Sequence, residues 1–200
     1  MASGIFIAGT GTSVGKSYAA AFFLSVMKKT KGKILYYKPI QCGLPSDTAF
    51  IKKTAKHKSV ANTYNLKTPS SPHFAFAKEK IKFDKKVIKD FLTEAKKQYH
   101  FIVMEGAGGL RVPITKNFDM ADLAKLSGFP VVLIASPNLG TINHTLLSID
   151  YLKSKKVKIK GFIFSWAEGV DFSSEMTLDN AKIIEEISEV PFCGSLPFIP

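Results

Sequence analysis

Short apolar runs alternate along the chain with longer segments whose apolar residues recur at helical spacing. The runs are GIFIA, KILYYK, YHFIVME, PVVLIA, IKGFIFSW and PFCGSL. Helical spacing predicts helices over 16–29, 46–56, 84–97, 141–154 and 173–188. Apolar strands that alternate with helices indicate a largely parallel sheet with helices on both faces, because both faces of each strand must be covered. The sequence therefore predicts an α/β fold.

Residues at the ends of these segments suit the ends of helices. Asp84 and Ser173 are expected as N-caps, and Gly32 follows a lysine-rich helix end. In sheets of this kind, ligands bind beyond the carboxyl ends of the strands. The residues that directly follow each apolar run are therefore the candidates for chemistry.

Length and composition favour one ordinary domain spanning residues 1–200. The chain has 200 residues, of which 46% are hydrophobic, enough for one well-filled core. No apolar stretch approaches about 18 residues and the N-terminus lacks a signal-peptide pattern, so we expect a cytoplasmic protein with no membrane partner. Cys42 and Cys193 form no C-x-x-C pair and the four histidines are scattered, which argues against a disulfide scaffold or a structural zinc site.

The chain is strongly basic, with a formal net charge of +12. Such a charge raises the possibility of nucleic-acid binding. However, all of the 28 basic residues except Arg111 are lysines, whereas base and bidentate phosphate recognition favour arginine. We therefore expect no nucleic-acid partner, and a lysine-rich surface that attracts anionic substrates.

A glycine-rich loop, GTGTSVGKS, follows the first apolar run and precedes a helical segment. Its backbone N–H groups and the helix N-terminus suit a phosphate, Lys16 can reach β- and γ-phosphates, and the Ser17 hydroxyl can ligate magnesium. The loop is one residue longer than the usual G-x-x-x-x-G-K-[ST] pattern, because the first glycine is Gly9 and position 10 is Thr10. The alternatives are a glycine turn with a solvent-exposed lysine, and a dinucleotide fold, whose G-x-G-x-x-G spacing is absent.

Three further charged residues follow strands or begin helices. Lys38 is expected to end the second strand, since Pro39 should stop it. It is either an ordinary surface lysine or a cation that faces a phosphate or an acidic substrate at the same edge as the glycine-rich loop. Asp47 lies at an expected helix start and either caps the helix or ligates magnesium. Glu105 ends an apolar strand, where an unpaired structural carboxylate is costly, so we interpret it as a magnesium ligand. The glycines at 106–109 permit close approach of backbone to a ligand.

Taken together and in order, these motifs resemble the dethiobiotin synthetases, ATP-dependent carboxylases of biotin synthesis. The matching stretches are the lengthened loop, KPI, SD before a helix, SPH, EGAGGLRVPI, DLA and GTINH. The resemblance runs from about Gly4 to Phe198, and it explains the loop, because the longer glycine spacing is that family's own. It implies a P-loop NTPase fold.

The resemblance also implies a reaction and its parts. An amine of a diaminononanoic acid takes up CO2 to give a carbamate, ATP phosphorylates the carbamate, and the second amine closes a ureido ring. Lys16, Lys38 and Thr12 are implied as catalytic residues, and Mg2+ as the cofactor, held by Ser17, Asp47 and Glu105. The implied nucleotide-binding residues are Ser13, Val14, Gly15, Lys16, Ser17, Tyr18, Asp47, Glu105, Gly106, Ala107 and Gly108. The implied substrate-binding residues are Thr12, Lys38, Cys42, Gly109, Thr141, Ile142 and Asn143.

The same resemblance implies a homodimer, in which the helix that starts at Thr141 completes the partner's active site. Ordinary capping by Thr141 is the alternative reading of that helix start. The chain departs from the family's pattern at Ser13, where Glu is frequent, and at Cys42, where Ser is frequent. It departs again at Ser165 and Trp166, where the family commonly has an Asn that pairs with adenine, so we predict weak discrimination among ATP, GTP, CTP and UTP.

Two other classes of protein remain as alternatives. A ParA/MinD-type partitioning ATPase shares the expected fold, but its loop carries an additional lysine at the position of Gly11. A cobyrinate-type amidotransferase needs a glutaminase domain, for which 200 residues leave no room.

Overall fold

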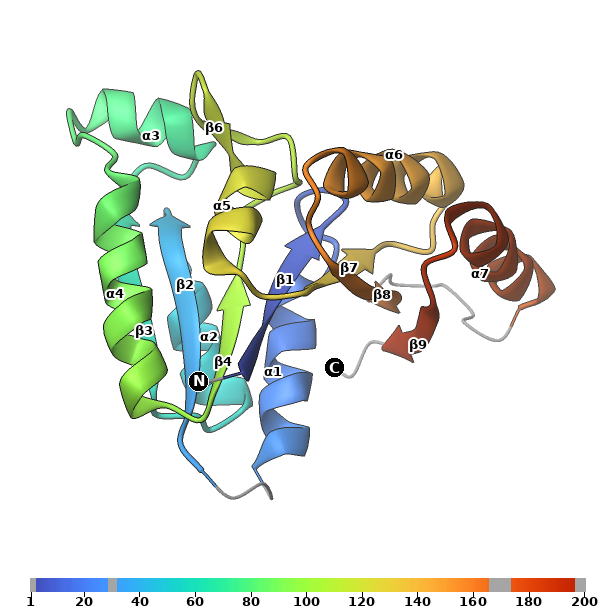
Figure 1. Cartoon of the computed structure of the whole chain (residues 1–200), viewed down its shortest axis with the longest axis horizontal. Helices are drawn as coiled ribbons and strands as arrows, with labels where there is room; N and C mark the ends of the chain where they lie inside the picture. The colour runs from blue at the N-terminus through green and yellow to red at the C-terminus, as the bar shows by residue number, and fades with distance from the viewer. Residues whose placement is uncertain (1–2, 29–31, 166–173, 197–200) are drawn as a thin grey trace.

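The structure is a computed structural model that describes residues 3–28, 32–165 and 174–196 (Figure 1). Within these residues, seven strands form one parallel sheet in the order β3-β2-β4-β1-β7-β8-β9. They are β1 (Ser3–Gly9), β2 (Ile34–Cys42), β3 (Val60–Leu66), β4 (Phe101–Glu105), β7 (Val131–Ala135), β8 (Ile159–Ser165) and β9 (Phe192–Leu196). A small antiparallel pair, β5 (Pro113–Thr115) and β6 (Phe118–Asp119), lies apart from it.

Helices pack on both faces of the sheet, and each face has its own apolar core. One core joins the sheet to α1 (Lys16–Met27) and α2 (Asp47–Thr54). The other joins it to α3 (Pro72–Lys78), α4 (Lys85–Gln98), α5 (Met120–Ser127), α6 (Thr141–Ser154) and α7 (Glu175–Ser188). The predicted α/β class with a covered parallel sheet is confirmed. No helix in the described ranges is long and apolar enough to cross a membrane.

Strand alternation decides which side chains meet. In β2, Tyr37 packs in the core on the α4 side, whereas Tyr36 packs in the core on the α1 and α2 side. Lys38 is two residues after Tyr36, so it faces the same way as Tyr36. Glu105 likewise shares a face with Val103, which packs on the α1 and α2 side. The side chains of Lys38 and Glu105 therefore lie on the face of the sheet that α1 and α2 cover.

The prediction that Pro39 ends the second strand is wrong. Strand β2 continues through Pro39 to Cys42. It pairs with β4 only from Ile34 to Tyr37, and beyond that point only with β3. One edge of β2 is therefore unpaired at Pro39, where the missing N–H costs no ladder bond. Lys38 lies where the neighbouring strand β4 ends, not at the end of its own strand.

The expected helices are present with small changes at their ends. Asp84 is the N-cap of α4, and its carboxylate accepts from the Lys86 N–H at 2.8 Å. Ser173 lies outside the described residues, and the N-cap of α7 is Ser174. Helix α1 ends at Met27 with Lys28 as its C-cap, so Gly32, at a φ of +118°, does not directly follow the helix.

Five elements had no prediction: β3, α3, α5, β5 and β6. Strand β3 has the sequence VANTYNL and lies at the edge of the sheet, so its side chains are mostly half-buried and its pattern is not apolar. Helix α3 has seven residues and the strands of the β5-β6 pair have three and two, too short for a periodic signal.

Candidate active site

The glycine-rich loop joins β1 to α1 at the carboxyl edge of the sheet. Gly15 is the N-cap of α1 at a φ of 88°, a left-handed conformation that glycine adopts without strain. Of the described residues, no side chain caps this helix start, and its first turn holds no acidic residue. The helix N-terminus therefore offers N–H groups and partial positive charge to an anion.

Lys16 is folded back over this loop. Its ammonium donates to the Gly11 carbonyl at 2.7 Å, and the residue is 7% exposed. Burial lowers the pKa of Lys16 to about 8, and the nearby Lys38 ammonium adds to the effect. A Cβ on Gly9 would lie 2.9 Å from this ammonium, so the glycine at position 9 makes room for the lysine. The alternative of a solvent-exposed lysine on a glycine turn is wrong.

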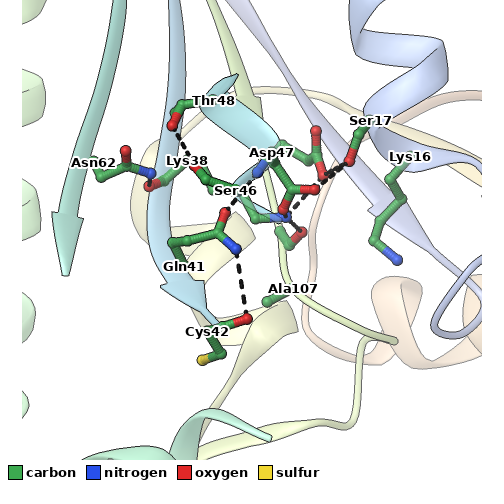
Figure 2. Close-up of polar contacts among 12 residues, drawn as sticks. Lys16, Ser17, Lys38, Gln41, Cys42, Ser46, Asp47, Thr48, Asn62 and Ala107 are labelled. Carbon is green, nitrogen blue, oxygen red and sulfur yellow. Dashed lines mark hydrogen bonds and ion pairs between the residues drawn. The ribbon is translucent and has the colours of Figure 1, made fainter. Parts of the chain in front are cut away.

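Three oxygen-bearing side chains meet beside the loop, and two of them, those of Ser17 and Asp47, are labelled in Figure 2. The Ser17 hydroxyl lies 2.9 Å from Oδ1 of Asp47 and 2.8 Å from Oε1 of Glu105. Ser17 is the second residue of α1, and Asp47 is the first residue of α2. Glu105 is the last residue of β4. Helix starts and strand ends come together here because every strand of the sheet runs in the same direction.

Lys38 links the two carboxylates. Its ammonium lies 2.7 Å from Oδ2 of Asp47 and 2.8 Å from Oε1 of Glu105, and it donates to the Gly106 carbonyl at 3.0 Å. Burial alone would lower the pKa of Lys38, but Glu105 and Asp47 outweigh it and raise that pKa. Burial alone would raise the pKa of Asp47, but the Lys38 ammonium outweighs it and lowers that pKa. Lys38 and Asp47 therefore stabilise each other's charged form.

Each carboxylate had an alternative interpretation. Asp47 does not cap α2, because the N-cap is Ser46, and the Asp47 carboxylate turns to Ser17 and Lys38 instead. Glu105 is 1% exposed, as a structural residue would be, but its charge is paired. Both carboxylates therefore belong to the cluster at the glycine-rich loop.

The donor set suits Mg2+, a hard cation that prefers oxygen ligands. Within the described part of the chain, no group of three or more His, Cys, Asp or Glu residues could hold a metal by itself. The protein offers two carboxylates and one hydroxyl, and Mg2+ in nucleotide sites is commonly bound by one or two carboxylates together with phosphates and water. Ser17, Asp47 and Glu105 fit that arrangement.

A cavity of about 1090 Å³ opens beside this cluster. Of the residues predicted for the site, its lining includes Thr12, Ser13, Gly15, Lys16, Ser17, Tyr18, Lys38, Cys42, Asp47, Glu105, Ala107 and Gly108. The predicted residues outside its lining are Val14, Gly106, Gly109, Thr141, Ile142 and Asn143. The structure thus brings most of the predicted site together around one cavity.

The residues outside the lining have two different locations. Val14 is buried in the core, and the Gly106 carbonyl accepts from the Lys38 ammonium. Gly109 packs against the glycine-rich loop, where an added Cβ would be 3.2 Å from the Thr10 carbonyl. The other group begins α6, whose N-cap is Gly140 at a φ of 93°. Capping by Thr141 is therefore wrong, because its side chain is buried near Thr145.

Cys42 lines the cavity at the end of β2. Burial raises the pKa of its thiol to about 11, although Lys38 acts in the opposite direction. Since the thiolate is the nucleophilic form, the side chain is an unreactive neutral thiol at physiological pH.

Two residues that sequence analysis missed support the cluster. The Tyr36 hydroxyl donates to Oε2 of Glu105 at 2.8 Å. Gln41 Oε1 accepts from the Asp47 N–H at 3.0 Å, which fixes the start of α2 against the end of β2 (Figure 2). Strand alternation with Lys38 is a signal that could have revealed Tyr36. Gln41 had no such signal, because its contact depends on how the chain turns after β2.

Solved structures share this fold. A ParA family ATPase from Chlorobium tepidum aligns with a TM-score of 0.62 at 13% identity, covering 100% of this chain and 86% of that one. MinD from Pyrococcus horikoshii, complexed with Mg-ADP, aligns with a TM-score of 0.61 at 17% identity, covering 98% and 82%. At such identities the likeness shows the fold alone, which is that of P-loop NTPases.

Sequence relatives are more specific. A family model described as an AAA domain matches residues 3–200. The ATP-dependent dethiobiotin synthetase of Methanocaldococcus jannaschii is 35% identical over 198 residues, covering 95% of this chain and 92% of that protein. That of Thermodesulfovibrio yellowstonii is 35% identical over 219 residues, covering 100% and 90%. Such identity over nearly the whole of both chains shows that this chain belongs to the ATP-dependent dethiobiotin synthetases, a family of ligases in biotin biosynthesis.

Proposed function

We propose that this protein closes the ureido ring of dethiobiotin from 7,8-diaminopelargonic acid, CO2 and ATP, and that residues 1–200 form one domain for this purpose. One amine adds to CO2 to give a carbamate. A carbamate oxygen attacks the γ-phosphorus, ADP leaves, and a carbamic-phosphoric anhydride results. The second amine then attacks the carbonyl carbon and displaces phosphate. The observation that carries the proposal is the cluster of Lys38, Ser17, Asp47 and Glu105 beside the phosphate loop of a family member.

This reaction asks the protein mainly to position its substrates and to stabilise negative charge. The start of α1 and the backbone of Ser13–Tyr18 hold the nucleotide phosphates, and Lys16 leaves the Gly11 carbonyl to donate to the β- and γ-phosphates. Because Lys16 is largely buried, it need shed little water to do so. The backbone of Ala107 and Gly108, which line the cavity, completes its nucleotide side.

Lys38 acts on the carbamate. Its ammonium already faces the cavity from between two carboxylates, which keep it protonated. It stabilises the charge that develops on the carbamate and on the transferred phosphoryl group. Thr12 and Cys42, which line the cavity, hold the diamine end, with Cys42 contributing its backbone. When bound by Ser17, Asp47 and Glu105, Mg2+ would neutralise charge on the nucleotide phosphates.

The carboxylate end of the substrate is received by a second copy of this chain. The start of α6 at Thr141–Asn143 does not line the cavity of its own chain, although its free N–H groups suit a carboxylate. Asn143 is exposed there, as is Leu139, which precedes the helix and is 98% exposed. In a homodimer, this helix start completes the partner's cavity.

Mass spectrometry tests the function directly. The protein is incubated with 7,8-diaminopelargonate, bicarbonate, Mg2+ and ATP, and dethiobiotin is sought by its mass together with an equal amount of ADP. Omission of the diamine is the control, since ADP formed without it reports ATP hydrolysis alone. ATP hydrolysis without any dethiobiotin would contradict the proposal.

That outcome would instead favour a ParA/MinD-type ATPase, the second candidate. The observation in its favour is the fold shared with solved ParA and MinD structures. Against it stands Gly11, at the position where the loop of those ATPases carries an additional lysine. Stimulation of ATP hydrolysis by DNA, with no effect of the diamine, would distinguish the second candidate from the first.

A further inference from the structure

Two neighbouring tyrosines in β2 are fully buried, but they point to opposite faces of the sheet. The Tyr37 hydroxyl bonds to the Thr63 hydroxyl, and its ring stacks on Phe91 of α4. The Tyr36 hydroxyl lies on the other face and donates to Oε2 of Glu105 at 2.8 Å. Only Tyr36, of these two, touches the cluster beside the phosphate loop.

The contacts of Glu105 divide between its two oxygens. Oε1 faces Ser17 and the Lys38 ammonium, each at 2.8 Å. Oε2 accepts a hydrogen bond from the Tyr36 hydroxyl at 2.8 Å. One carboxylate oxygen is thus held by a buried tyrosine, while the other contacts the Ser17 hydroxyl and the Lys38 ammonium.

We propose that Tyr36 is a positioning residue for the divalent cation: by holding Oε2 of Glu105, it keeps Oε1 aimed at Ser17. This inference rests on the proposed role of Glu105 as a magnesium ligand. The carboxylate of Glu105 can rotate about its last bond, and the other donors to it, Ser17 and Lys38, both bind the same oxygen. Among the described residues, Tyr36 is the hydrogen-bond donor to Oε2. Without the phenol hydroxyl, the carboxylate would therefore turn toward the Lys38 ammonium and the Ser17 hydroxyl. Partners that orient ligands in this way typically change metal affinity by about 10- to 100-fold.

The test compares Tyr36→Phe with Tyr37→Phe, because each variant removes one buried hydroxyl from the same strand and keeps the ring. Binding of ADP is measured by calorimetry without divalent cation and at increasing Mg2+. For Tyr36→Phe we expect ADP affinity without Mg2+ to stay within about twofold of wild type, and the Mg2+ concentration needed for half of the enhancement to rise about tenfold. Tyr37→Phe should keep the wild-type Mg2+ dependence, although we expect the loss of its buried hydroxyl to lower the melting temperature.

A rescue variant separates donation from packing. Replacement of Tyr36 by 4-aminophenylalanine restores a donor at the same point of the ring and should restore the Mg2+ dependence, even if Tyr36→Phe is poorly folded. The inference is overturned if Tyr36→Phe needs no more Mg2+ than wild type, if Tyr37→Phe shows the same shift, or if the amino variant does not recover. Because the readout is binding, it stands whether or not the protein makes dethiobiotin. Wild-type ADP binding that ignores Mg2+ would overturn the magnesium assignment and this inference together.

Discussion

Lys38 and Glu105 form an ion pair in the interior of the protein, with 2.8 Å between Nζ and Oε1 and no more than 5% of either side chain exposed. They come from β2 and β4, which are adjacent in the sheet, although the two residues are 67 positions apart in the chain. The same ammonium contacts Asp47 at 2.7 Å, so one buried cation separates two carboxylates. This relationship explains why each of the three residues depends on the other two.

Replacement of Lys38 by alanine should destabilise the fold most at neutral pH. Breaking a buried pair by removing one partner leaves an uncompensated charge, which typically costs about 3 kcal/mol. In the wild type, the pKa of Asp47 is lowered, so its contribution to stability is present above the unfolded pKa and is lost as pH falls through the folded value. The difference between variant and wild type should therefore shrink as pH falls below about 4.

Urea unfolding at pH 7 and at pH 3.5 measures this difference. Lys97→Ala is the control, because Lys97 forms an exposed pair with Glu94 and its loss should change stability little. An equal loss of stability for Lys38→Ala at both pH values would show that the charges do not cause it.

Nucleotide affinity should fall as pH rises above about 8. Burial and Lys38 lower the pKa of Lys16 to about 8, so the ammonium is present below that pH and is lost above it. Bound phosphates favour the ammonium, so binding above pH 8 must take up a proton, and the dissociation constant for ADP should rise by up to about tenfold per pH unit. Calorimetry from pH 7 to 9.5 tests this, with Lys16→Met as the variant that should show no such slope. A flat wild-type profile would mean that Lys16 does not contact the phosphates.

Lys16→Ala and Glu105→Ala should each abolish turnover. Lys16 is placed to donate to phosphate and Glu105 to hold the cation, and removal of one preorganised electrostatic contact typically costs about 100-fold or more in rate. Dethiobiotin formation is the readout, and circular dichroism shows whether each variant is folded. Near-normal activity in either folded variant would refute the assignment of the site.

Base discrimination should be weak. Ser165 ends β8, is fully buried and does not line the cavity, and Trp166 lies outside the described residues. A serine hydroxyl also lacks the paired donor and acceptor of an Asn amide. We expect GTP, CTP and UTP to support turnover within about tenfold of ATP, or about 1.4 kcal/mol. A preference for ATP above about 100-fold in kcat/KM would show that other groups read adenine.

Two inactive variants should restore activity when mixed, if the site is shared between subunits. Lys16→Ala disables the phosphate loop, and Asn143→Glu places a negative charge where the substrate carboxylate is proposed to bind. A mixed dimer has one site with both defects and one with neither, so unfolding and refolding the mixture should return about a quarter of wild-type activity. Light scattering should give the mass of a dimer. A fully active monomer would rule out the shared site.

The sequence by itself determined the repeating elements and the loop. Apolar strands that alternate with helical segments require a covered parallel sheet, and α6 runs over the predicted residues 141–154. The glycine spacing around Lys16 indicated a phosphate loop, since that chemistry resides in consecutive residues. Local patterns of this kind need no knowledge of distant parts of the chain.

Only the tertiary structure decided which distant residues touch. Strand β2 can continue through Pro39 because its neighbour β4 no longer pairs with it there. The polar sequence of β3 forms a strand because β3 lies at the edge of the sheet. The contact of Tyr36 with Glu105 required the order and register of two strands that are not consecutive in the chain. The physical reason is that a side chain's own sequence fixes the face on which it lies, whereas its partner is fixed by the packing of the whole sheet.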